Sequence, residues 1–156
     1  TASVPVAIYA QAMGIGRERL LRAVALADLV TVHQKAGIGC LSAFCGATCA
    51  GCGAGAGIAY LLGGDYKAVA HTIVNALAVV SGMVCDGAKP SCAAKISSAI
   101  DAGILGYELY CRGQEFLDGD GIIRKGVDNT IGNVGRMARS GMRETDRVIL
   151  DIMCGC

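Results

Sequence analysis

The spacing of apolar and polar positions indicates helices along almost the whole chain. Apolar residues recur every three or four positions, and no segment alternates cleanly with a period of two. The breaks between the periodic segments fall at glycines and at a proline, which commonly end and begin helices. The pattern predicts an all-α fold, a compact bundle of about six or seven helices.

The periodic segments give the bounds of the predicted helices. They cover residues 5–13, 17–35, 42–62, 65–82, 90–111, 127–140 and 144–153. The helix over 17–35 is expected to bury a face of large apolar residues: Leu20, Leu21, Val24, Leu29 and Val32. The helix over 42–62 has no charge and consists mostly of small residues, so we expect it to be central and the most buried, because Gly and Ala let neighbouring helices approach closely.

Composition bears on the size and partners of the protein. Apolar residues make up 53% of the 156 positions and charged residues 17%, which is more apolar surface than a lone small domain usually buries. We therefore expect residues 1–156 to be a single helical domain that belongs to something longer. The net charge is +1, no basic run occurs and aromatic residues are scarce, which argues against nucleic acid as the main partner.

The uncharged run over residues 36–64 is long enough to span a bilayer, but its Gly, Ala, Cys, Ser and Thr residues give little transfer energy. We interpret it as a helix buried in protein and expect no membrane partner. No secretory signal pattern opens the sequence. Nine cysteines in such a chain are expected to be thiols or metal ligands, and the expected compartment is the cytoplasm.

Three of the cysteines, in the stretch CGATCAGC, have the spacing with which radical-SAM enzymes hold an iron–sulfur cluster. Those enzymes place the three thiolates on a loop, whereas Cys45, Cys49 and Cys52 fall inside a predicted helix. Steps of four and three residues put them in one stripe along that helix. Free cysteine packs as a small hydrophobe, so close helix packing is the preferred interpretation of this triplet.

A second cysteine pair flanks a predicted turn in the stretch GMVCDGAKPSCAAKI. Cys85 precedes the turn, and Cys92 lies in the first turn of the next helix, where unpaired amides and the helix dipole favour a thiolate. Lys89 adds a positive charge nearby. Such a turn suits an iron–sulfur cluster, and the alternative is two core thiols beside a loop.

This stretch resembles the iron–sulfur-dependent L-serine dehydratase alpha-chain family, in its single-chain branch that includes L-cysteine desulfidase. Further motifs occur in the family's order along nearly the whole chain: GIAYLLGG, DGDGII, NTIGNVGRMARSGM and TDRVILDIM. The resemblance implies that the chain is the C-terminal, cluster-bearing domain of a longer enzyme. The missing partner would be an N-terminal domain or a second subunit, and a homo-oligomer is possible.

The resemblance also implies a cofactor, a ligand set and a reaction. The cofactor is a 4Fe–4S cluster with one open iron, and its ligands are Cys45, Cys85 and Cys92. Cys40 is the main alternative to Cys45 as the ligand that precedes the turn. The substrate is a small amino acid. The implied reaction is β-elimination of L-cysteine to pyruvate, ammonia and hydrogen sulfide, and the alternative is the L-serine dehydratase reaction to pyruvate and ammonia.

Several residues are candidates for roles at this site. Lys89 and Asp86 are the expected catalytic residues, and His71 is a weaker candidate for the base that removes the α-proton. Asn75, Asn129 and Asn133 either hold helices together or face the substrate. A non-enzymatic alternative is a zinc-binding helical interaction domain, in which Cys49, Cys52 or His71 supplies a fourth ligand. One thiol of the tail, Cys154 or Cys156, is a further candidate for the open iron; the simpler expectation is a frayed end.

Overall fold

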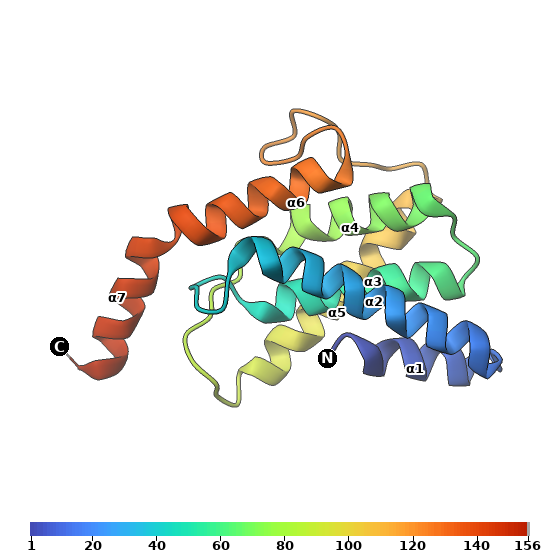
Figure 1. Ribbon diagram of the computed structural model, residues 1–156, viewed down its shortest axis with the longest axis horizontal. Coiled ribbons are helices and arrows are strands. Elements are labelled where there is room, and N and C mark those ends of the chain that lie inside the picture. Colours follow the sequence, from blue (N-terminus) through green and yellow to red (C-terminus); the bar gives the residue numbers. More distant parts are fainter. Residues whose placement is uncertain (156) are drawn as a thin grey trace.

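The computed structural model describes residues 1–155 and shows a bundle of helices joined by loops (Figure 1). A π-helical segment, Met137–Gly141, joins α6 to α7. Within residues 1–155 the extended backbone pairs only in an isolated bridge between Phe44 and Val84, so the all-α prediction is confirmed. The helices are α1 (Ser3–Ala12), α2 (Arg17–Ile38), α3 (Gly46–Leu61), α4 (Tyr66–Val80), α5 (Cys92–Cys111), α6 (Val127–Arg136) and α7 (Arg143–Cys154).

Helix α3 is the centre of the bundle, as its composition predicts. Every residue from Thr48 to Ala59 is buried, and α2, α4 and α5 all pack against this helix. Within residues 1–155 no helix combines the length and apolar character needed to cross a membrane. The α3 part of the uncharged stretch is buried, because the neighbouring helices surround it.

Glycines set the distance and the direction of these contacts. A methyl group on Gly57 would lie 2.9 Å from the carbonyl oxygen of Ala23, and one on Gly53 would collide with the carbonyl of Ala27, so α2 runs antiparallel to α3. On another side, a methyl group on Gly55 would lie 2.7 Å from the Cα of Gly103. Close backbone approach of this kind fixes how far α2 and α5 can slide along α3.

The buried face of α2 matches the prediction only in part, since Leu20 and Val24 are half-buried against the core. The large residues Leu21, Leu29 and Val32 are exposed, whereas Ala23 and Ala27 are fully buried. The glycines of α3 bring the two backbones so close that only small side chains fit between them. Leu21, Leu29 and Val32 are thereby left on the opposite side.

Two predicted boundaries also need correction. Helix α3 begins at Gly46 and not at residue 42: Cys45 is its N-cap and has an extended backbone, with φ −69° and ψ 122°. The hydroxyl of Ser42 accepts a hydrogen bond from the Phe44 N–H and holds this segment outside the helix. Helix α2 continues through Gly37, where it packs against Gly135, and ends at Ile38, because the C-cap Gly39 has a φ of +98°.

Candidate functional site

Three helix ends meet at one end of the bundle. Gly51 lies against Ala99 and Gly55 against Gly103, so α3 and α5 run parallel with a constant offset in residue number. The N-terminal ends of these two helices carry Cys45, the N-cap of α3, and Cys92, the first residue of α5. Helix α4 is antiparallel to α3, since the Thr48 hydroxyl donates to the carbonyl of Val80 at 3.3 Å. The site is therefore formed by the N-termini of α3 and α5 and by the chain that leaves α4.

Backbone pairing joins the segment of Cys45 to the segment of Cys85. The Cys45 N–H donates to Met83 O at 3.0 Å, and the Cys85 N–H donates to Ala43 O at 2.6 Å, on either side of the bridge between Phe44 and Val84. Alternation along paired extended segments puts Cys45 and Cys85 on the same face of this bridge. Cys40 lies in the exposed loop after α2 and takes no part in the pairing.

Cys92 is the first residue of α5, close to its predicted position in the first turn. Its thiol donates to the carbonyl oxygen of Gly87 at 3.6 Å across the turn. Cys45 is buried, Cys92 is half-buried and Cys85 is exposed. The three thiols thus come from three segments of chain that meet at this end of the bundle.

A carboxylate between two ammonium groups occupies the turn. Asp86 forms ion pairs with Lys89 and with Lys95, and these hydrogen bonds lower the pKa of its carboxyl group to about 2. Lys95 also donates to the carbonyl of Val84 at 2.8 Å. Lys95 is not among the residues expected from the sequence, because nothing along the chain indicates its contacts with Val84 and Asp86 across the turn.

Within residues 1–155, no three His, Cys, Asp or Glu side chains converge closely enough to hold a single metal ion. Cys49 and Cys52 are buried in the core rather than at the turn. Burial raises the pKa of the Cys49 thiol to about 11 and raises that of Cys52 as well, so both are neutral thiols. These two cysteines pack in the core as expected and do not complete a zinc site.

His71 lies far from the turn that carries Cys85 and Cys92. Its Nδ1 is 3.2 Å from a carboxylate oxygen of Glu115, without the alignment of a hydrogen bond, and its ring stacks on Tyr110 at 5.7 Å. Tyr110 is near the C-terminal end of α5 and Cys92 is at its start, a separation of about 27 Å along the helix. Within this chain, His71 therefore cannot act on a molecule bound at the turn.

The three asparagines hold the chain together. The buried Asn75 donates to Gly106 O at 3.0 Å and accepts from the Phe116 N–H at 3.2 Å, which ties α4 to α5 and to the following loop. Asn129 and Asn133 donate to the carbonyls of Lys125 and Ile122, each at 2.8 Å. The contacts of all three are with the backbone.

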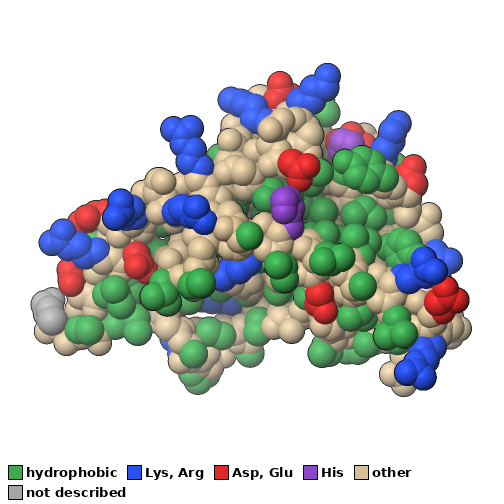
Figure 2. All heavy atoms as spheres, viewed as in Figure 1, with side chains coloured by type: hydrophobic (Ala, Val, Ile, Leu, Met, Phe, Trp, Pro, Cys, Tyr) green, Lys and Arg blue, Asp and Glu red, His purple; other side chains and the backbone are tan. Residues whose placement is uncertain are grey.

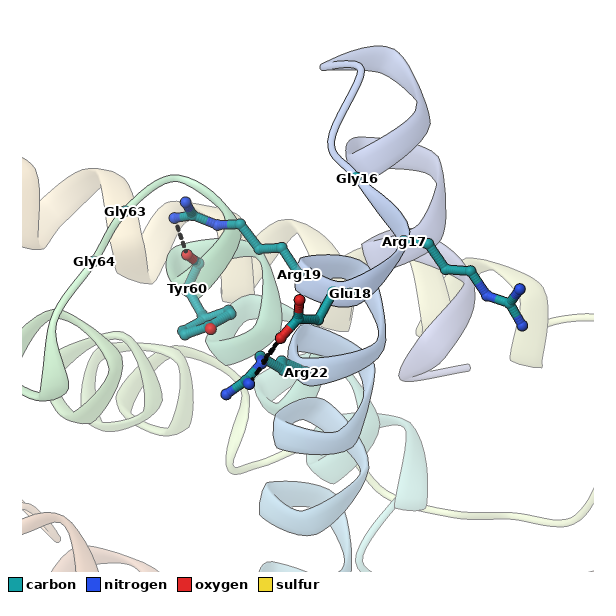
Figure 3. A pocket seen from close by; sticks show the side chains of 8 residues that line it. All are labelled: Gly16, Arg17, Glu18, Arg19, Arg22, Tyr60, Gly63 and Gly64. Atoms are coloured by element: carbon teal, nitrogen blue, oxygen red, sulfur yellow. Dashed lines mark hydrogen bonds and ion pairs between the residues drawn. The ribbon is translucent and has the colours of Figure 1, made fainter.

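A hollow of about 700 Å³ lies at the opposite end of α3. Figure 3 shows Arg19 reaching the carbonyl of Tyr60 and Glu18 pairing with Arg22. Arg19 also lies over the Tyr60 ring, 5.6 Å from its centroid. Arg19 thus satisfies a carbonyl at the C-terminal end of α3, Arg22 is paired with Glu18, and no thiol lines this hollow.

The C-terminal helix approaches the cysteine turn. A methyl group on Gly87 would lie 2.9 Å from Cε of Met153, so the end of α7 packs over the turn. Cys154, the next residue, is exposed. Cys156 lies outside the described residues.

The sequence matches known proteins over most of its length. The model of the family described as serine dehydratase alpha chain matches residues 2–151. The chain belongs to the serine dehydratase alpha-chain family. Membership in this family confirms the resemblance on which the cluster ligands and the reaction were expected.

Relatives in this family show that the chain is shorter than they are. It is 61% identical over 153 residues to a UPF0597 protein of Desulfitobacterium hafniense, covering 98% of this chain and 36% of that protein. A UPF0597 protein of Treponema denticola is 48% identical over 151 residues, which is 97% of this chain and 35% of the relative. The chain thus spans just over a third of the length of these relatives. No solved structure matches it.

Proposed function

We propose that the protein is an iron–sulfur-dependent lyase that eliminates the β-substituent of L-cysteine and yields pyruvate, ammonia and hydrogen sulfide. Family membership supports a lyase. What supports the cluster is that the segments carrying Cys45, Cys85 and Cys92 are joined: backbone pairing links the first two, and the Cys92 thiol donates to the carbonyl of Gly87 in the turn after Cys85. Three thiols without a hard oxygen ligand form a donor set that suits iron–sulfur chemistry.

The residues present fit such a group. Cys45, Cys85 and Cys92 would hold it, and with three protein ligands the bound cluster supplies an open iron that acts as a Lewis acid toward the β-substituent. The N-termini of α3 and α5 lie at this end of the bundle, and the positive ends of their helix dipoles stabilise negative charge there. Free thiols of this kind persist in a reducing compartment, in line with a cytoplasmic enzyme.

The catalytic roles divide between the two residues expected from the sequence. Lys89 is the more exposed lysine of the turn and is available to bind the carboxylate of the substrate. Asp86 is held between two ammonium groups, so its role in the proposal is to orient them. Neither residue is assigned the removal of the α-proton.

The test is anaerobic purification followed by analysis of metal, sulfide and products. The proposal expects iron and acid-labile sulfide in the protein, a brown colour, and pyruvate with hydrogen sulfide from L-cysteine. A higher kcat/KM for L-serine would favour the dehydratase alternative. Stoichiometric zinc without iron or sulfide would favour the zinc-binding interaction domain and refute the lyase proposal.

The exposed apolar side of the bundle suggests where the rest of a longer protein docks. Leu29 and Val32 of α2 are exposed, and a groove of about 310 Å³ runs between α2, α4 and α6. Figure 2 shows hydrophobic side chains gathered over α2 and α4 on this face. We propose that the remaining part of the polypeptide covers it, since the relatives are far longer than this chain.

A further inference from the structure

Lys95 connects the start of α5 to both sides of Cys85. Its ammonium donates to the carbonyl of Val84 at 2.8 Å and pairs with the carboxylate of Asp86. Val84 and Asp86 are the residues directly before and after Cys85. A single side chain therefore ties the segment of Cys85 to the helix that begins with Cys92.

Lys89, which shares the same carboxylate, has a different position. Its pair with Asp86 lies within the turn and so connects the turn to no other element. The Lys89 side chain is 42% exposed and the Lys95 side chain 21%. Solvent screens the pair of Lys89 more strongly, so it contributes less to the geometry of the turn.

The charge of Lys95 also lies near the proposed ligands. Its hydrogen bond and charge interaction with Asp86 raise the pKa of Lys95, and the thiolate charges of Cys45 and Cys92 raise it further because both lie within electrostatic reach. Thiolates gathered at one place repel one another, and a nearby ammonium offsets part of that repulsion.

We propose that Lys95 is a positioning residue of this site: its ammonium holds the Cys85 segment against α5 and so sets Cys45, Cys85 and Cys92 in place for a thiolate-bound group. The ligand role of the thiols rests on the proposed function. The mechanical role of Lys95 does not, because its contacts are present in the protein without any bound group.

Amide hydrogen exchange in the metal-free protein tests this role directly. The Cys45 and Cys85 amides form the two backbone hydrogen bonds that join the site, so they report its opening. In Lys95→Met we expect these amides to exchange about tenfold or more faster than in the unchanged protein, because the link to α5 is lost. We expect the exchange rates of these amides to change by no more than about threefold in two controls. Lys95→Arg keeps the charge and the hydrogen-bond donors, and Lys89→Met removes the other lysine that pairs with Asp86.

A second readout follows reconstitution with iron and sulfide under anaerobic conditions. Lys95→Met should retain less than about half of the iron bound by the unchanged protein, with an altered electron paramagnetic resonance spectrum, and Lys95→Arg should restore both. Circular dichroism establishes that each variant folds. If Lys95→Met does not fold, Lys95→Gln replaces it, and the expected increase in the exchange rates of the Cys45 and Cys85 amides is the same.

The proposal is overturned if the Cys45 and Cys85 amides exchange at the same rate in Lys95→Met as in the unchanged protein. It is also overturned if Lys89→Met accelerates this exchange as much as Lys95→Met does. If the unchanged protein binds no iron–sulfur group, the proposed function fails, while the exchange rates still decide the role of Lys95.

Discussion

The close contact between α3 and α5 predicts a large effect of Gly103→Ala. The new methyl carbon would lie 2.5 Å from the carbonyl oxygen of Gly51 and 3.1 Å from both the N and the Cα of Gly55, whereas ordinary contacts are 3.4–4 Å. All three atoms belong to the backbone of a buried helix, so no side chain can turn aside. Helix α5 must therefore move away by about 1 Å.

The size of the effect follows from two opposed terms. Overpacking costs about 1–3 kcal/mol, and contact with rigid backbone puts this case near the upper end. Alanine stabilises a helix by about 1 kcal/mol relative to glycine, so the net decrease in the free energy of unfolding is about 2 kcal/mol. In a chain of this size that loss lowers Tm by about 4–8 °C.

Thermal and urea unfolding followed by circular dichroism measure this loss. The matched control is Gly132→Ala in α6, where a methyl group meets nothing within 4 Å, and this variant should gain about 0.5–1 kcal/mol. Because α5 also carries Cys92 and Lys95, Gly103→Ala should reduce iron retention as well. A variant as stable as the unchanged protein would show that α3 and α5 are not packed at this distance.

Four further predictions concern single positions or the tail. The proposed ligands are Cys45, Cys85 and Cys92, and alanine at any one of them should abolish iron retention, measured as iron per chain. Alanine at Cys49 or Cys52 should keep the iron and lower the free energy of unfolding by roughly 1 kcal/mol. Burial raises the pKa of Cys49 from 9.0 to about 11, so its proton is lost more readily from the unfolded chain. Stability in urea should therefore fall as the pH rises from 9 toward 11, and Cys49→Ala should lessen the fall. Gln34 is buried, and neither polar atom of its amide has a partner within residues 1–155, so Gln34→Met should raise the free energy of unfolding by about 1 kcal/mol; a loss would show that the amide is satisfied by something else. Deleting residues 154–156 should lower the substrate concentration needed for half-maximal turnover if a tail thiol competes for the open iron, and unchanged kinetics in cluster-loaded enzyme would count against that competition.

Much of the site could be found from sequence because its motif is local. Cys85, Asp86, Lys89 and Cys92 lie within eight positions, and the turn and the helix start that hold them depend on the intervening Gly and Pro. Lys95 escaped notice because its partners, Val84 and Asp86, lie across the turn. A lysine in an exposed-looking helix start has no sequence signature of such a contact.

The sequence by itself determined the helical segments, the central place of the small-residue helix and the family of the protein, because helix periodicity, glycine content and motif order are properties of the chain. Tertiary structure decided which faces meet. The glycines of α3 admit Ala23 and Ala27 and turn Leu29 outward, against the order expected from hydrophobicity alone. Close packing of α3 on α5 likewise puts the N-terminal ends of both helices, which carry Cys45 and Cys92, at the same end of the bundle. The physical reason is that these faces are chosen by backbone contact between segments distant in sequence. Such contact depends on the shapes of both segments, and the sequence of one segment alone does not determine it.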